Sequence, residues 1–184
     1  MEVVWYTAMS MDGRIADADD DLSFLDLIGE REEPTGDEFA AFLGGIDAVV
    51  VGAGTMRWLL RAGHGWPHDD LPTWLVSHDR GLLEQVGKTR SPLRLATGDL
   101  GQMFDEIEVA GHHRVWLSGG GDIAGQALAA DRIDEVVATV APTVVGAGPA
   151  LFDGQALPRR RFRLVECTSA GGDAARLRWV REAV

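Results

Sequence analysis

Three consecutive glycines, Gly119 to Gly121, separate an apolar run from a segment that favours helix. Residues 115–117 (VWL) predict a short buried strand, and IAGQALAA after Asp122 predicts a helix. Glycines let the backbone approach an anion without Cβ clashes, and the start of a helix offers unpaired N–H groups and partial positive charge. The pattern indicates a phosphate-binding turn, with a plain tight turn as the alternative. Asp122 is a candidate cap for the helix.

A second junction of the same kind lies earlier in the chain. Residues 48–51 are all apolar and predict a strand buried on both faces. Gly52, Ala53, Gly54 and Thr55 lead from it into a helix predicted over 56–61. Two such junctions in one small domain favour anion binding over coincidence. The Thr55 hydroxyl is a candidate donor to a phosphate or a cap for the helix.

Composition excludes several classes of protein. With 29 acidic and 17 basic residues in 184, the net charge is −12, which argues against sequence-independent binding of nucleic acid. No run approaches a membrane span, and we expect no signal peptide. The single cysteine, Cys167, excludes an intramolecular disulfide and a Cys-cluster zinc site, and we expect it buried in a strand. No metal site is expected, and these features predict a cytoplasmic protein with one domain over 1–184.

Predicted strands alternate with predicted helices along most of the chain, and a hairpin closes it. The strands are 2–8, 48–51, 73–77, 93–97, 115–117 and 135–140; the helices are 22–28, 37–43, 56–61, 80–86, 100–110 and the segment after 122; the hairpin joins 161–167 to 176–181. This order predicts an α/β domain with a largely parallel sheet and an antiparallel edge. Ligands bind such sheets at the carboxyl ends of strands, where both glycine junctions and residues 8–13 would lie.

Four segments together resemble the dihydrofolate-reductase-like superfamily, in the branch of the RibD C-terminal domain, the reductase domain of bacterial riboflavin biosynthesis. They are TAMSMDGRIA, VVVGAGTMR, WLSGGGDIAGQAL and IDEVVATVAPTVVGAGPALF, in the family order and over nearly the whole chain. The resemblance implies a three-layer α/β/α fold, with a mixed, mostly parallel sheet and an antiparallel C-terminal edge. The zinc deaminase domain of the bifunctional riboflavin enzyme is missing, which implies a stand-alone member.

The same resemblance implies NADPH-dependent transfer of a hydride to a pyrimidine- or pterin-like heterocycle. The cofactor-binding residues that it implies are Gly52, Gly54, Thr55, Ser77, His78, Arg80, Ser118, Gly119, Gly120, Gly121, Asp122 and Ile123. The substrate would lie near the exit of the first strand, against Met11, Asp12 and Arg57. Asp12 would be the catalytic residue that hydrogen-bonds the substrate, or it only closes its own turn.

Departures from the family keep other functions open. Ala53 replaces the arginine with which dihydrofolate reductases bind the 2′-phosphate, so Ser77, His78 or Arg80 would supply that contact and NADH stays an alternative. WLLRAG follows Arg57 in place of the acidic–proline segment of the sugar-phosphate site. The alternatives are a nucleotide-binding protein without turnover and a reductase with a flavin-type cofactor.

Three further expectations concern single positions and assembly. Trp58 and Trp66 are candidates to line a pocket for a planar ligand. Asp37 or Glu38 stands roughly where the folate enzymes carry their pterin-binding acid, or is an ordinary acid at a helix start. The apolar strand at 135–140 and the closing hairpin leave edges to cover, which, with the resemblance to dimeric reductases, predicts a homodimer. The alternative is a monomer in which the arginines of the hairpin keep its edge solvated.

Overall fold

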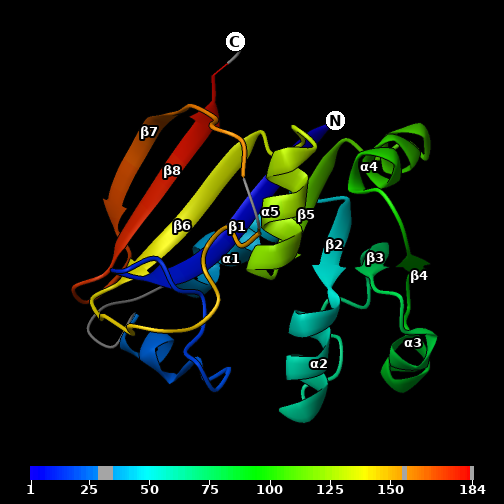
Figure 1. Cartoon of the computed structure of the whole chain (residues 1–184), viewed down its shortest axis with the longest axis horizontal. Helices are drawn as coiled ribbons and strands as arrows, with labels where there is room; N and C mark the ends of the chain where they lie inside the picture. The colour runs from blue at the N-terminus through cyan, green and yellow to red at the C-terminus, as the bar shows by residue number, and fades with distance from the viewer. Residues whose placement is uncertain (29–34, 155–156, 183–184) are drawn as a thin grey trace.

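An eight-stranded sheet forms the centre of the molecule in the computed structural model, which describes residues 1–28, 35–154 and 157–182 (Figure 1). The strands are β1 (Glu2–Ser10), β2 (Ala48–Gly52), β3 (Thr73–Val76), β4 (Leu93–Ala96), β5 (Arg114–Gly119), β6 (Glu135–Ala141), β7 (Phe162–Ser169) and β8 (Ala175–Arg181). Their order in the sheet is β4-β3-β2-β5-β1-β6-β8-β7. The pairs among β1–β6 are parallel, and β8 is antiparallel to both β6 and β7. The predicted mixed sheet with an antiparallel C-terminal edge is confirmed.

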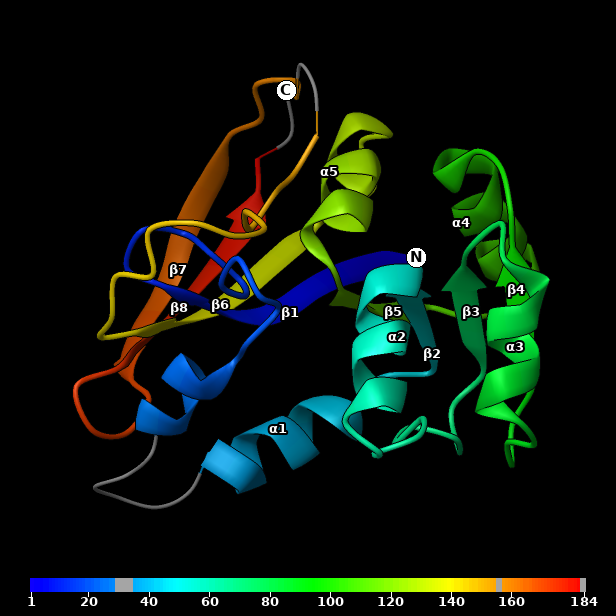
Figure 2. The same cartoon turned by 60° about the horizontal axis from the view of Figure 1, so that its bottom comes forward.

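Helices cover both faces of this sheet, which gives the expected three layers (Figure 2). The helices are α1 (Thr35–Leu43), α2 (Ala53–Arg61), α3 (Arg80–Val86), α4 (Leu100–Val109) and α5 (Gly121–Ala129), with a short 3-10 helix, η1 (Ser23–Leu27). α4 and α5 pack on one face, where Phe104 and Ile107 are fully buried. α1, α2 and α3 pack on the other, around Met56 and Leu82. Every residue of β2 is buried, as expected for a strand covered on both faces.

Between β2 and β5 the order in which the chain adds strands to the sheet reverses: β3 and β4 follow β2 on one side, and β6 lies on the other side beyond β1. β2 and β5 are parallel neighbours, with Val50 opposite Leu117. The chain leaves β2 into α2, which packs on one face, and leaves β5 into α5, which packs on the other. Such a switch opens a crevice at the carboxyl ends of the strands, the usual place for a ligand in an open α/β sheet. Both glycine junctions therefore meet at one edge, as the sequence predicts.

Two helix starts differ from the prediction. α2 begins at Ala53, so Gly54 and Thr55 belong to its first turn and not to the loop before it. Asp122 does not cap α5, because Gly120 takes that position. The Asp122 carboxylate accepts a hydrogen bond from the Gln126 side chain one turn later, at 2.9 Å. Within the described ranges, no helix is long and apolar enough to cross a membrane.

The C-terminal edge of the sheet also corrects one expectation. Cys167 lies in a strand, as predicted, but it is exposed and not buried. The reason is that β7 pairs with β8 on one side only and forms the end of the sheet. Leu164 on the same strand is 50% exposed. The homodimer stays a prediction.

Candidate functional site

A cavity of about 700 Å³ opens at the carboxyl ends of β1, β2 and β5, a size typical of sites for small molecules and cofactors. One wall consists of the turn from Gly52 to Thr55, and the opposite wall of the turn from Ser118 to Asp122. The segment between Ile15 and Leu25 contributes a third side. We call this space the first cavity.

Two helices begin at this cavity without a side-chain cap. Gly52 precedes α2 and Gly120 precedes α5, and neither can supply a capping oxygen. The N–H groups in the first turn of each helix have no acceptor within their helix. Their partial positive charges face the same space, so the geometry suits a ligand that carries more than one phosphate.

In the second turn, a different structural feature explains the glycine at each of the three positions. Gly119 has a φ of +134°, a conformation that side chains rarely adopt. Gly120 has a φ of −93°, and a Cβ there would meet the Thr55 hydroxyl only at 3.6 Å. A Cβ on Gly121 would overlap the carbonyl oxygen of Ala150. Conformation thus requires Gly119 and packing requires Gly121, whereas Gly120 leaves room for a ligand.

One face of α2 continues the wall away from the helix start. Gly54, Arg57, Trp58 and Arg61 all line the first cavity, at the spacing that places residues on one side of a helix. Arg57 pairs with Asp79 at 3.2 Å, and Arg61 pairs with Asp20 at 3.0 Å. All four of these charged side chains are about half exposed, so the pairs are weak and an anionic ligand can replace the carboxylates. Sequence reasoning missed Arg61, although its spacing of one turn from Arg57 was a usable signal.

The two tryptophans proposed for a planar-ligand pocket have different positions. Trp58 lines the first cavity. Trp66 is buried in the core beneath α2, where its indole N–H donates to the Thr73 hydroxyl at 3.1 Å. The first placement agrees with the expectation and the second does not, because the loop before β3 folds Trp66 inward.

A second cavity of about 340 Å³ adjoins the first. Its lining consists of Tyr6, Thr7, Ala8, Ile28, Phe39, Trp116, Ser118, Thr139 and Arg176. Three of these residues, Thr7, Ala8 and Ser118, also line the first cavity. Burial raises the pKa of the Tyr6 hydroxyl above its ordinary value, and the nearby Arg176 opposes that shift. The two cavities therefore meet at the ends of β1 and β5, and the second has aromatic walls that suit a planar ring.

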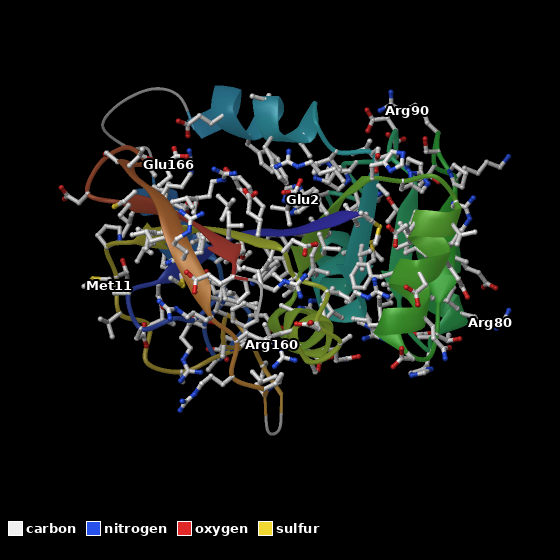
Figure 3. The ribbon with its side chains drawn as sticks, turned by 90° about the horizontal axis from the view of Figure 1, so that it is seen from above. Glu2, Met11, Arg80, Arg90, Arg160 and Glu166 are labelled. Carbon is white, nitrogen blue, oxygen red and sulfur yellow. The ribbon has the colours of Figure 1, made fainter. Side chains whose placement is uncertain are left out.

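Several residues that the sequence proposes for the site do not line either cavity. Figure 3 shows Met11 and Arg80 at opposite ends of the molecule, and Met11 is 65% exposed. Ser77 is buried and its hydroxyl accepts the N–H of Asp79, while His78 points to solvent. Ile123 is buried beneath Gly52 and supports the turn from below.

Asp12 is held within its own turn and by the segment that follows β6. Its carboxylate accepts hydrogen bonds from the Ser10 hydroxyl at 2.7 Å and from the N–H groups of Val145 and Gly146 at 3.0 and 2.8 Å. These bonds lower the pKa of Asp12 from 3.8 to about 2. With its oxygens engaged in this way, the geometry favours the turn-closing alternative over contact with a substrate.

Replacement of Asp12 should reveal this role through pH. A lowered pKa stabilises the folded state at pH values above 3.8, and that contribution is lost as the pH falls towards about 2. Asp12→Asn should therefore lower the free energy of unfolding near neutral pH, and its difference from wild type should shrink in acid. Urea unfolding over a pH series measures it. Asp19→Asn is the control, since no described hydrogen bond uses that carboxylate, and a pH-independent difference for Asp12→Asn would contradict the prediction.

The chain is related in sequence to known proteins. The family model of the RibD C-terminal domain matches residues 1–175. The chain is 28% identical over 182 residues to the uncharacterized protein YwjB of Bacillus subtilis (strain 168), with 98% of each chain covered.

Solved structures share the fold at lower identity. A protein of Shewanella sp. PV-4, whose name refers to riboflavin biosynthesis, superposes with a TM-score of 0.82 at 24% identity and covers 100% of both chains. The Thermotoga maritima diaminohydroxyphosphoribosylaminopyrimidine deaminase/5-amino-6-(5-phosphoribosylamino)uracil reductase matches 98% of this chain and 56% of its own, with a TM-score of 0.69 at 16% identity. The Saccharomyces cerevisiae riboflavin biosynthesis reductase Rib7 matches 98% of this chain and 90% of its own, with a TM-score of 0.62 at 15% identity.

Proposed function

The chain belongs to the RibD C-terminal domain family, and on this premise we propose that it is a reductase that transfers a hydride from NADPH to a pyrimidine- or pterin-like heterocycle. One observation carries the proposal. A cavity suited to a dinucleotide and a cavity suited to a planar ring share Thr7, Ala8 and Ser118. Two ligands bound there would meet at this boundary, as direct hydride transfer requires.

The residues of the first cavity fit a dinucleotide cofactor. The starts of α2 and α5 would hold its phosphates. Gly54 and Gly120 leave space for them, since no described residue outside the neighbouring helix backbone lies within 4 Å of a Cβ on Gly54. Arg57 and Arg61 add positive charge along the same wall. When bound, the nicotinamide supplies the hydride.

The residues of the second cavity would orient the acceptor. Phe39 and Trp116 provide faces for stacking, and the hydroxyls of Thr139 and Ser118 provide hydrogen bonds to ring substituents. The names of two structural relatives refer to reduction of a ribosylaminouracil and to riboflavin biosynthesis, which supports a pyrimidine-type ring.

The test is to titrate the purified protein with NADPH and then to follow NADPH oxidation with pyrimidine and pterin candidates. Binding followed by turnover is the expected result. Binding without turnover would favour the nucleotide-binding alternative, and a bound chromophore after purification would indicate a flavin-type cofactor. Failure to bind NADPH would refute the proposal.

Cofactor choice offers a sharper prediction, because Arg57 lines the first cavity and Arg80 does not. A charge-assisted contact is worth ~1.5–3 kcal/mol, so Arg57→Ala should weaken NADPH binding by about 10- to 100-fold and NADH binding less. Arg80→Ala removes the same charge and should leave both affinities unchanged. Calorimetric titration of the two variants measures the difference. Selective loss of NADPH in Arg80→Ala would restore the role that the sequence suggests for that residue.

A further inference from the structure

Arg176 is the one charged residue among the described residues that line the second cavity. It lies on β8, opposite Thr139 of β6, and its side chain is only 12% exposed. A cation is costly to bury unless it is paired and hydrogen-bonded. The guanidinium of Arg176 therefore needs hydrogen-bond or ion-pair partners in the cavity.

Two partners come from the protein, and they leave part of the guanidinium free. The Nε of Arg176 donates to the Thr139 hydroxyl at 3.4 Å. Its Nη1 pairs with the carboxylate of Glu38 on α1. No hydrogen bond or ion pair within the described part of the chain uses Nη2. The Nη2 group of this mostly buried cation can therefore donate hydrogen bonds to a ligand in the second cavity.

The pairing with Glu38 also changes what the cavity can recognise. A free acid at the start of α1 would accept hydrogen bonds from amino groups of a ring. Here the Glu38 carboxylate is engaged by Arg176. A guanidinium donates hydrogen bonds and never accepts them, so the charged group that lines this cavity can bind only acceptor atoms.

We infer that Arg176 determines substrate specificity in the second cavity, where Nη2 donates to carbonyl or anionic oxygens on the edge of a planar ring. Glu38 is the positioning residue that holds the guanidinium in place. The inference rests on the proposed function, in which this cavity receives the hydride acceptor. A ring with amino groups at that edge would place donors against donors and bind poorly.

Two pteridines of the same size test this inference. Lumazine carries two carbonyl groups, and diaminopteridine carries amino groups in their place. Calorimetric titration of the wild-type protein, with and without NADPH, should give a Kd for lumazine at least about tenfold lower than that for diaminopteridine. Arg176→Met should weaken lumazine binding by about 10- to 100-fold and remove the preference. Arg176→Lys keeps the positive charge but loses the planar set of guanidinium donors. It should give a ratio of the two Kd values between those of wild type and Arg176→Met.

Further measurements separate recognition from a purely structural role. NADPH affinity should be unchanged in every variant, because Arg176 does not line the first cavity. Glu38→Gln should reduce the ratio of the two affinities by a smaller factor than Arg176→Met. Equal weakening of both probes in Arg176→Met would mean that Arg176 only supports the structure, and would overturn the inference.

The remaining outcomes distinguish this inference from the proposed function. A wild-type preference for diaminopteridine, or no binding of either probe to a protein that binds NADPH, would overturn the role of Arg176 and leave the cofactor site standing. Selective binding of lumazine to a protein that does not bind NADPH would instead support Arg176 and refute the reductase.

Discussion

Gly120→Val is expected to abolish dinucleotide binding in a protein that still folds. The backbone at Gly120 is extended, with a φ of −93°, so valine can adopt it. Its Cβ would lie 3.6 Å from the Thr55 hydroxyl and 3.8 Å from the Ile15 side chain, which are ordinary contacts. The branched methyl groups would then occupy the space between the starts of α2 and α5, where the phosphates are proposed to bind.

The expected loss is at least about 100-fold in NADPH affinity. Displaced phosphates lose two or more charge-assisted hydrogen bonds of ~1.5–3 kcal/mol each, and ~1.4 kcal/mol is a tenfold change in Kd. Fluorescence titration with NADPH measures the affinity, and circular dichroism checks the fold. Gly44→Val is the matched control, since a Cβ there also makes only ordinary contacts, at 3.5 and 3.6 Å, and Gly44 does not line the cavity. Unchanged affinity in folded Gly120→Val would remove this turn from the site.

Gly125→Ala is expected to destabilise the protein, against the usual effect of that substitution in a helix. Alanine normally stabilises a helix interior by ~1 kcal/mol relative to glycine. At Gly125 in α5, however, the added Cβ would overlap the carbonyl oxygen of Asp153, a backbone atom that cannot rotate away. Overpacking of this kind costs ~1–3 kcal/mol or more, so the net sign should reverse.

Gly54→Ala provides the comparison for this reversal. Gly54 is also helical, in α2, but among the residues that the structure describes none outside the neighbouring helix backbone lies within 4 Å of its added Cβ. We expect its free energy of unfolding to be unchanged or to rise by up to about 1 kcal/mol. Urea unfolding of the two variants beside wild type measures both. If Gly125→Ala were as stable as wild type, the segment near Asp153 would not pack against α5 as described.

Most elements could be predicted because their signals lie in neighbouring residues. The apolar run before Gly52 and the helix-favouring segment after Gly121 are local patterns, and they locate β2 and α5. The Asp-Gly pair at 12–13 is typical of a tight turn, and Gly13 has a φ of +74°. The side-chain alternation near the C-terminus likewise identifies the β7–β8 hairpin.

The site was predicted only in part. Both glycine turns lie on the first cavity, but Ser77, His78 and Arg80 do not, although they too follow a strand. The last residue of β3, Val76, does line the first cavity. Beyond it Ser77 is buried and accepts the Asp79 N–H, and His78 and Arg80 are exposed. The direction of the side chains that follow a strand depends on the tertiary structure, and a strand pattern in the sequence does not contain it.

The sequence by itself determined the fold class, the two turns and the family resemblance, because helix period, strand alternation and glycine content are properties of short segments. Tertiary structure alone decided that the Asp12 carboxylate accepts hydrogen bonds from the N–H groups of Val145 and Gly146. It also decided that Arg176 pairs with Glu38 at the second cavity. Each of these contacts joins segments far apart in the chain. The first depends on β1 lying beside β6. The second depends on the register of β8 on β6 and on the packing of α1 beside them. The sum of many core contacts sets these arrangements, rather than the residues that meet.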